Sequence, residues 1–297
     1  MLSWTQVDFE GSQSLNADMK ILRQHSGLSS FLKPYFFRMS WNTLTSNLSL
    51  FMVAMLIAST FQLTACSTAD TTDTSTPEGA MKVADEYAKD DRFEEAIAKY
   101  SDVKNKFPYS RLAAEAELKI ADINFSRESY IEAQNDYQLF REFHPKHPKS
   151  DYVTFRLAMS YFNQLPTTVD RDLSLADKAI SFFDDEIKNY PASKYTEDSK
   201  KHRDEALHML ASKEIYIARF YDKHKKFDSS EKRYEGLLKN YPNIGFDPLA
   251  LFGAANAAYQ QGDKDRASQH LKNLYSLFPN SNESKRAKNE FKKLGAD

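Results

Sequence analysis

The sequence predicts an all-α protein in which five helical hairpins stack into a right-handed superhelical solenoid. Two observations lead to this fold class. Five prolines recur behind the same pattern of small and large residues, which indicates a repeated helical unit. Glycine is scarce, at 8 of 297 residues, and this argues against a turn-rich all-β fold. A signal peptide and a flexible tether are expected ahead of the hairpins.

Residues 1–65 are expected to be a leader that is removed from the mature chain. Within it, residues 48–63 form an uncharged, mainly apolar run, which is short for a membrane-spanning helix of roughly twenty residues and suits the apolar region of a signal peptide. Lys33 and Arg38 supply the positive charge that precedes such a region. The stretch ahead of the run is unusually long, which leaves Met39, or a codon somewhat upstream, as an alternative start.

The only cysteine of the chain, Cys66, stands shortly after the apolar run in the sequence Leu63-Thr64-Ala65-Cys66. This resembles a bacterial lipobox, in which the chain is cleaved before the cysteine and the thiol carries a diacylglycerol. The alternatives are a buried lone cysteine behind an ordinary signal sequence and a short transmembrane anchor. Each buried CH2 of an acyl chain contributes roughly 0.8 kcal/mol, so lipidation of Cys66 predicts a lasting membrane anchor. The next residue is Ser67, and a serine at this position resembles the pattern of lipoproteins destined for the outer membrane.

A polar tether follows the cysteine. Residues 66–77 contain the stretch STADTTDTSTP, which is small, polar and low in complexity and is typical of a solvated linker. The folded domain is expected over residues 78–297. The formal net charge of the whole chain is −2, so no general cationic field is available to bind nucleic acid. A single cysteine excludes a disulfide framework and a thiolate cluster for zinc.

The repeated unit is defined by its proline. Eight residues before each proline stands a large residue, and twelve residues before it stands a small one. These two positions are one helical turn apart on one face, so the small residue lets a neighbouring helix approach and the large one fills the space beside it. The proline ends the second helix because it cannot continue the hydrogen-bond ladder. The prolines are Pro108, Pro145, Pro191, Pro242 and Pro279, the large residues are Tyr100, Tyr137, Phe183, Tyr234 and Leu271, and the small residues are Ala96, Ala133, Ala179, Ser230 and Ala267.

Small residues also recur in the first helix of each unit, and together these columns match the tetratricopeptide pattern, a two-helix unit of about 34 residues. The alternative is an ordinary α-helical bundle with chance periodicity. The first-helix residues are Ala84, Ala121, Ala218 and Ala255, with Ala158 out of step in the third repeat. The expected repeats span about 78–110, 111–148, 149–193, 194–244 and 245–282, and a capping helix follows.

The two inner repeats are longer than the ideal unit. An insertion is expected near residues 163–173, which accounts for the displaced alanine of the third repeat. Residues 195–221 contain neither Gly nor Pro and predict one unusually long helix in the fourth repeat.

No enzyme motif accompanies the repeats, so a non-catalytic protein without cofactor or metal is expected. The sequence contains no GxSxG, HExxH, P-loop or GxGxxG motif. His144 and His147 have no carboxylate cluster at metal-ligand spacing, and His202 and His208 are six residues apart, which is unsuitable for a shared metal.

Runs of charged residues are interpreted as solvated helix faces. This interpretation covers the paired carboxylates Glu94-Glu95 and Asp184-Asp185-Glu186. The basic last helix is interpreted as a charged cap that keeps the end of the stack soluble, in preference to a lipid or nucleic-acid site. Its basic residues are Lys285, Arg286, Lys288, Lys292 and Lys293.

A stack of this type presents a concave groove lined mainly by the first helix of each repeat, and such grooves bind extended segments or partner helices. The aromatic content of repeats two and three suggests a pocket for the aromatic end of a client peptide, although each ring could instead pack between repeats. The groove residues are predicted to be Asp85, Asp122, Phe125, Tyr152, Phe155, Met159 and Phe162. Met81, Lys89 and Leu118 are placed on the same face.

The fourth repeat is charged and better suits docking of another folded domain, since charges at the rim of an interface give specificity and fast association. The insertion ahead of it carries three further charges. The residues predicted to dock a partner are Asp170, Arg171, Asp172, Glu214, Arg219 and Arg233, and Asp222 and Lys223 belong to the same face.

These features together resemble the BamD family of lipoproteins, which belong to the machinery that assembles β-barrel proteins. The resemblance covers about residues 78–282. It departs from the family pattern in the long leader and in Leu271, which replaces the usual aromatic residue. The stretches that carry it are 170–172 (DRD), 190–196 (YPASKYT), 214–221 (EIYIARFY), Arg233 and 241–242 (YP).

The resemblance implies a lipid-anchored scaffold on the periplasmic face of the outer membrane. Its carboxy-terminal half is expected to contact the periplasmic domains of the barrel-assembly protein, and other assembly lipoproteins are further expected partners. Its amino-terminal half is implicated in receiving unfolded outer-membrane proteins, whose last strand commonly ends in an aromatic residue.

Two other functions are compatible with the sequence. A periplasmic tetratricopeptide lipoprotein that coordinates cell-wall or cell-division proteins would share the anchor and the repeats, but not the long helix or the Asp-Arg-Asp insertion. A lipid-anchored hydrolase with an unrecognised site is the alternative from another class.

Overall fold

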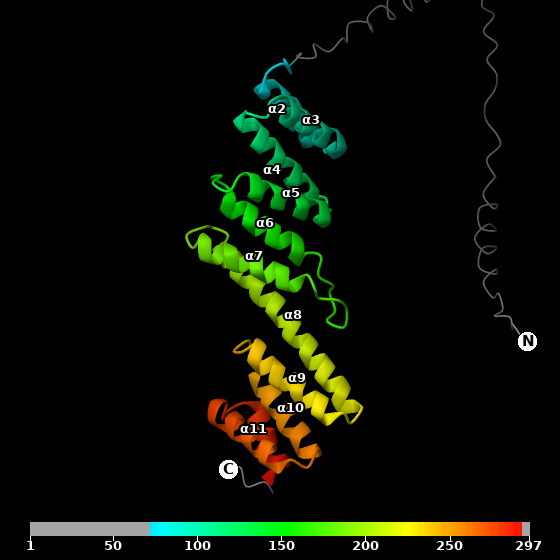
Figure 1. The fold of residues 1–297 in the computed structure, drawn as a ribbon, viewed down its shortest axis with the longest axis vertical. Helices are drawn as coiled ribbons and strands as arrows, with labels where there is room; N and C mark the ends of the chain where they lie inside the picture. Colours follow the sequence, from blue (N-terminus) through cyan, green and yellow to red (C-terminus); the bar gives the residue numbers. More distant parts are fainter. Residues whose placement is uncertain (1–71, 293–297) are drawn as a thin grey trace, which may run out of the picture. The chain divides into compact units, whose positions relative to one another are not determined.

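The computed structural model describes residues 72–292, and within this range it contains eleven α-helices and no strand (Figure 1). The leader, Cys66 and the first half of the tether, through residue 71, lie outside the described residues. The first helices of the hairpins are α2 (Pro77–Lys89), α4 (Arg111–Ser126), α6 (Ser150–Phe162), α8 (Thr196–Lys223) and α10 (Asp247–Gln260). The second helices are α3 (Phe93–Lys106), α5 (Tyr130–Phe143), α7 (Ala176–Asn189), α9 (Phe227–Asn240) and α11 (Lys264–Leu277), and α12 (Asn282–Glu290) follows.

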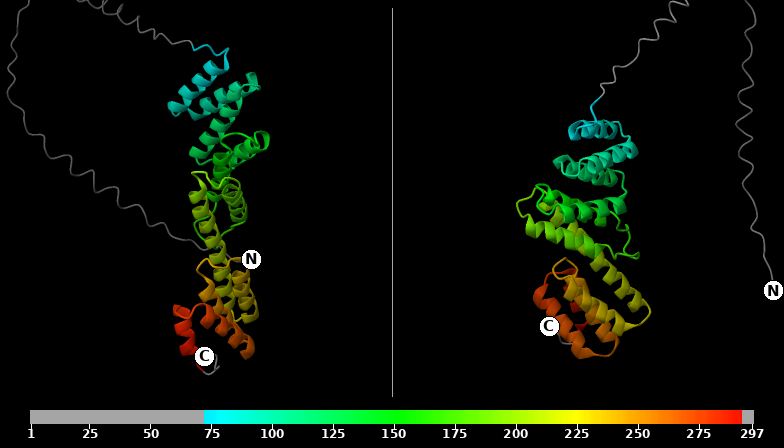
Figure 2. Two further views of the ribbon diagram at one scale, coloured as in Figure 1. Left: turned by 90° about the vertical axis from the view of Figure 1, so that its left-hand side faces the viewer. Right: turned by 45° about the horizontal axis from the view of Figure 1, so that its top comes forward.

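Each helix packs on the next one in the chain, so the helices from α2 to α11 form five successive hairpins. Figure 2 shows the hairpins following one another in the order of the sequence. The described residues therefore confirm the predicted all-α fold of tetratricopeptide-type hairpins. No helix of residues 72–292 combines the length and the apolar character that crossing a bilayer requires.

The columns of small and large residues form the contacts between helices, as predicted. All five small residues of the second helices are completely buried, from Ala96 to Ala267. The large residues one turn later are at most 4% exposed, and Tyr234 is the most exposed of them. The small residues thus let neighbouring helices approach closely, and the large side chains one turn later fill the space beside them. This dense packing stabilises the stack of hairpins.

The prolines end the second helices, also as predicted. The residue before each proline is the helix C-cap, and in all five repeats it has φ between −124° and −134° and ψ between 53° and 55°. A residue that precedes proline is disfavoured in the helical region, so this position leaves the helix in the same way each time. The C-caps are Phe107, His144, Tyr190, Tyr241 and Phe278.

A left-handed residue closes the hairpin turn in four of the five repeats, and the sequence did not predict it. Its own N–H and the next N–H bond back to carbonyls of the first helix, for example Asp91 to Ala88 and Arg92 to Tyr87. This is the Schellman arrangement that satisfies the last carbonyls of a helix. In these four turns the residue with positive φ is Asp91, Glu128, Lys225 or Gly262.

The two inner repeats are longer than the others in the predicted places, and only repeat three lacks the left-handed turn. In repeat three, α6 ends at Phe162 and α7 begins at Ala176, so the insertion forms an extended loop. Leu173 of this loop is buried and attaches it to the hairpin. In repeat four, α8 has 28 residues, whereas the other first helices have between 13 and 16.

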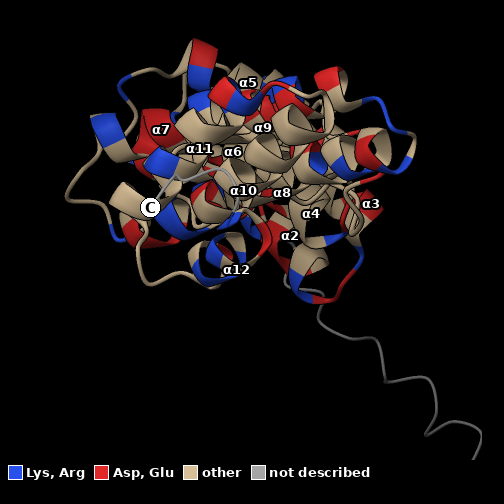
Figure 3. Cartoon of the chain, turned by 90° about the horizontal axis from the view of Figure 1, so that it is seen from below, with Lys and Arg blue, Asp and Glu red and all other residues tan. Residues whose placement is uncertain are grey.

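The short helix α12 covers the end of the stack with its buried Ala287, and its C-cap residue Phe291 is buried there too. Its Lys285, Arg286 and Lys288 are exposed, and Figure 3 shows the basic character of this helix. Lys293 lies outside the described residues.

Three expectations about single residues were wrong. Glu186 is completely buried and does not belong to a solvated face, because it occupies the inner side of α7. Met81 and Leu118 are 5% and 1% exposed, so they pack between helices and do not line a groove.

Candidate functional site

Asp122 is the centre of an aromatic cluster between repeats two and three. Its Oδ1 accepts hydrogen bonds from the hydroxyls of Tyr137, at 2.6 Å, and Tyr152, at 2.7 Å. Burial, together with the hydrogen bond to Asp122, raises the pKa of Tyr152 to about 12. Both phenols therefore remain protonated donors at neutral pH and hold the carboxylate between α4, α5 and α6.

Arg156, which was not among the predicted groove residues, completes this cluster. Its guanidinium carbon lies 3.8 Å from the centroid of the Phe125 ring. Its Nε donates to the hydroxyl of Tyr152 at 3.1 Å. Arg156 follows Tyr152 by four residues on one helix face, and this spacing was the available signal.

The other predicted groove aromatics continue the cluster toward α8. The Phe155 and Tyr195 rings are stacked, with centroids 5.0 Å apart and planes 14° from parallel. Phe162 contacts the imidazole of His202 at 5.0 Å between ring centroids. The rings pack between repeats but remain half-buried, so part of each is open to a partner.

Asp85 belongs to a separate site in repeat one. It accepts a hydrogen bond from the Tyr100 hydroxyl at 2.6 Å and forms an ion pair with Lys119 at 2.9 Å. The structure thus brings Asp122, Phe125, Tyr152 and Phe155 together, whereas Asp85 repeats the same contact one hairpin earlier. Met159 packs against the hydrophobic cluster of repeats two and three.

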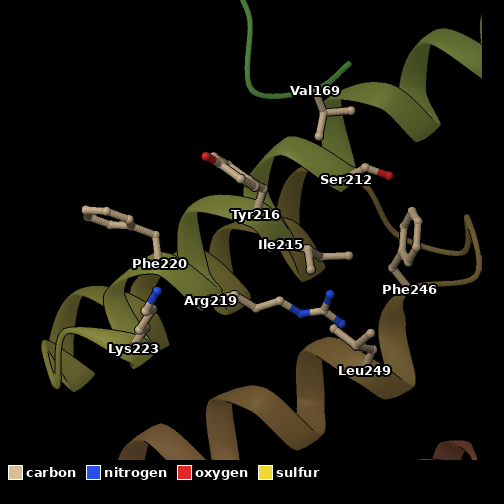
Figure 4. A pocket seen from close by; sticks show the side chains of 9 residues that line it. All are labelled: Val169, Ser212, Ile215, Tyr216, Arg219, Phe220, Lys223, Phe246 and Leu249. Atoms are coloured by element: carbon tan, nitrogen blue, oxygen red, sulfur yellow. The ribbon is translucent and has the colours of Figure 1, made fainter. Parts of the chain in front are cut away.

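The second candidate site is a pocket of about 530 Å³ along α8, which we call the α8 pocket (Figure 4). Tyr216 and Phe220 are 52% and 50% exposed and stand one helical turn apart, so they form adjacent exposed rings on one face of α8. In Figure 4, Arg219 extends from α8 toward Leu249 of α10. The lining residues are Val169, Ser212, Ile215, Tyr216, Arg219, Phe220, Lys223, Phe246 and Leu249.

The α8 pocket follows from the length of α8. The first part of this helix packs on α7, while its last part packs on α9 and contributes Ala211, Ile215 and Ala218 to the core of repeat four. Because α8 is extended, the next hairpin is displaced along it (Figure 1). The lining residues of α8 recur at intervals of three and four residues, and this spacing is the signal that could have predicted one continuous face of aromatic and basic side chains here.

The structure places the six predicted docking residues in different settings. Arg219 lines the α8 pocket. Glu214 and Arg233 form an ion pair of 3.1 Å between α8 and α9. The insertion is attached to α8 because the Nζ of Lys213 donates to the carbonyl of Arg171 at 2.6 Å.

The acidic residues of the insertion are exposed. Hydrogen bonds from Thr168 to Asp170 and from Ser174 to Asp172 hold the pKa of both carboxyls below the usual range. The loop next to Val169 therefore carries negative charge, whereas the α8 pocket itself contains the cations Arg219 and Lys223.

The chain is similar to known proteins over most of these hairpins. Residues 74–251 match the model of the family described as YfiO, outer membrane lipoprotein, and residues 249–281 match the model of the tetratricopeptide repeat. Three curated relatives are called outer membrane protein assembly factor BamD. The relative from Caulobacter vibrioides is 26% identical over 185 residues, which are 62% of this chain and 60% of that protein.

The other two relatives are covered more fully. The protein from Neisseria meningitidis serogroup B is 26% identical over 238 residues, which are 74% of this chain and 88% of the relative. The protein from Rickettsia prowazekii is 28% identical over 190 residues, which are 64% of this chain and 75% of the relative. The chain thus spans less than two thirds of the length of the Caulobacter relative.

Proposed function

The chain belongs to the YfiO family of outer membrane lipoproteins, and from this premise we propose that it is a non-catalytic scaffold of the complex that assembles β-barrel proteins in the outer membrane. The relatives that are named outer membrane protein assembly factor support a role in the assembly of outer-membrane proteins. The stacked hairpins support the scaffold role, because such stacks present extended binding surfaces.

The α8 pocket is the proposed docking site for the periplasmic part of the barrel-assembly protein. The observation that carries this assignment is the exposure of Tyr216 and Phe220 beside Arg219 and Lys223. Aromatic residues and arginine dominate the binding energy of protein interfaces. The expected partner surface presents an apolar residue next to a carboxylate, which would pair with the two cations. Docking of other assembly lipoproteins to this protein is also proposed.

The aromatic cluster around Asp122 is the proposed receiving site for unfolded outer-membrane proteins. Its half-buried rings, Phe125, Tyr152 and Phe155, could pack with the aromatic end of a client strand. Arg156 lies over Phe125 and adds a positive charge that could pair with a terminal carboxylate.

A lipid on Cys66 is the proposed attachment to the periplasmic face of the outer membrane. This proposal rests on the lipobox and the family description. The tether of residues 66–77 then separates the hairpins from the bilayer.

Recovery of partners from detergent-solubilised envelopes tests the function. The wild-type chain is expected in the membrane fraction and should recover the barrel-assembly protein. Arg219→Glu should reduce this recovery by about tenfold or more, because it places a negative charge opposite the partner's carboxylate. Lys188→Glu is the matched control: it makes the same charge change at an exposed position of α7 outside the α8 pocket.

The outcome separates the proposed function from the alternatives. Equal recovery with Arg219→Glu and Lys188→Glu would contradict docking at the α8 pocket. Recovery of cell-wall or cell-division proteins without the barrel-assembly protein would instead support a periplasmic coordinator.

A further inference from the structure

Three side chains from two helices converge beside the hairpins of repeats four and five. Glu231 and Glu235 stand one turn apart on α9, and His270 stands on α11. One potential ligand atom from each of the three lies within 4.8 Å of the others. None of them belongs to the α8 pocket or to the aromatic cluster.

The distances inside this group differ from those of a simple ion pair. The Nε2 of His270 lies 3.4 Å from Oε1 of Glu231 and 3.5 Å from Oε1 of Glu235. Two other histidine–carboxylate pairs are much shorter, at 2.8 Å for His144 with Glu117 and 2.9 Å for His202 with Glu205. His270 is therefore nearly equidistant from two carboxylates, and both separations are long for a charge-assisted hydrogen bond.

We propose that Glu231, Glu235 and His270 form a site for a divalent transition-metal ion such as Zn²⁺. Zinc binds imidazole nitrogen and carboxylate oxygen at about 2.0–2.2 Å in tetrahedral geometry, which requires ligand atoms to be about 3.3–3.5 Å apart. The two measured separations from Nε2 agree with this requirement. The ligand atoms of Glu231 and Glu235 lie within 4.8 Å of each other, and a small movement of the Glu235 side chain would bring them to the same spacing.

The second oxygen of Glu231 is held in place by neighbours. Its Oε2 accepts a hydrogen bond from Nε2 of Gln261 at 2.7 Å and lies 3.1 Å from Nη1 of Arg266. Glu231 is 1% exposed, so these contacts fix a buried carboxylate with its other oxygen directed at His270. Such outer contacts orient ligands in metal sites and raise metal affinity.

Charge and access also favour a dication. The guanidinium of Arg266 is shared between Glu231 and Asp263, to which its Nε donates at 2.7 Å, so the carboxylates around His270 leave a net negative charge. The side chain of Glu235 is 48% exposed, so an ion can enter from solvent and retain a water as its fourth ligand. The bound ion would join the second helices of repeats four and five, α9 and α11.

Calorimetric titration with ZnCl2 tests this site on the chain without an added histidine tag. The wild type is expected to bind one equivalent of zinc at this site and to unfold at a higher temperature with zinc than without it. His270→Gln should weaken that binding by about tenfold or more, since one of three ligands is lost. MgCl2 should give no comparable binding, because Mg²⁺ requires six oxygen ligands.

His144→Gln is the matched control because it removes a histidine that faces a single carboxylate. The His144→Gln variant retains all three proposed ligands. Each variant lacks one histidine and retains Cys66, so a difference in zinc affinity between them is due to the loss of His270. Circular dichroism establishes that each variant is folded. Absence of zinc binding by the wild type, or equal affinity of the wild type and a folded His270→Gln, would overturn the proposal.

Discussion

Glu186 occupies a position that the other four repeats fill with an apolar side chain. Within residues 72–292, both of its carboxylate oxygens are among the buried atoms that have no hydrogen-bond partner. Burial raises the pKa of this carboxyl, and the neighbouring hydroxyls of Ser199, Ser193 and Thr196 offset only part of that effect. The apolar residues at this position are Val103, Phe140, Leu237 and Leu274.

Glu186→Gln is therefore expected to stabilise the protein at pH 7 by on the order of 1 kcal/mol, because it removes a buried charge that the neighbouring hydroxyls compensate only in part. A carboxyl with a raised pKa favours the folded state below its ordinary value of 4.5, and this contribution is lost as pH rises through the folded-state pKa. The gain should thus be present at pH 7 and nearly absent at pH 4. Urea unfolding at both values measures it.

Asp184→Asn is the control for this prediction, since it makes the same type of change at an exposed neighbour. It should alter the free energy of unfolding by less than about 0.5 kcal/mol. A Glu186→Gln variant that is less stable than the wild type at pH 7 would show that the carboxylate has partners that compensate for burial.

The buried tyrosine of a repeat and the aspartate that accepts its hydroxyl occur together. In repeats one and two, the residue after the first-helix alanine is an aspartate that accepts the hydroxyl of the buried tyrosine. In repeat three the same two positions hold Met159 and Phe183, so the hydroxyl and its acceptor are lost together. Each aspartate thus gives a buried phenol its hydrogen-bond acceptor. This structural role accounts for the presence of Asp85 and Asp122 even when no ligand is bound.

At the scale of the helices, Gly253 of α10 shows how closely the hairpins of repeats four and five approach. A Cβ at this position would lie 2.5 Å from ring atoms of Tyr234 in α9. Tyr234 is 4% exposed, and its hydroxyl donates to Asp222 at 3.1 Å, so the ring has little freedom to move.

Gly253→Ala is expected to lower the free energy of unfolding by on the order of 1–3 kcal/mol through overpacking. Alanine favours the helix by about 1 kcal/mol relative to glycine, and this gain is smaller than the clash. Gly236→Ala is the control, because in α9 the added Cβ meets nothing within 4 Å and should stabilise by about 1 kcal/mol. Denaturant unfolding that shows a gain for both variants would contradict the described packing.

The helices differ in how well the sequence predicts their ends. The C-cap of each second helix was predictable, because a proline follows it in every repeat. The turns inside the hairpins were not, because their left-handed residues are Asp, Glu, Lys and Gly in different repeats. Those turns are fixed by backbone hydrogen bonds, which do not depend on one residue type.

For the molecule as a whole, the hairpin stack was predictable because each repeat contacts its neighbours in the chain, so its core appears as columns in the sequence. The candidate sites were harder to predict. The α8 pocket combines α8 with Val169 of the insertion and with Phe246 and Leu249 around the start of α10. The group of Glu231, Glu235 and His270 joins two helices that are not adjacent in sequence, and local spacing does not reveal it.

The central proposal is that exposed aromatic residues of α8 dock the barrel-assembly protein. Site-specific photo-crosslinking in intact envelopes tests it most directly, with the crosslinker at Phe220 and, as a control, at Tyr109, an exposed residue between α3 and α4. We predict an adduct with the periplasmic part of the barrel-assembly protein from position 220 and none from position 109. Adducts from both positions in equal amount, or none from position 220, would contradict the proposal.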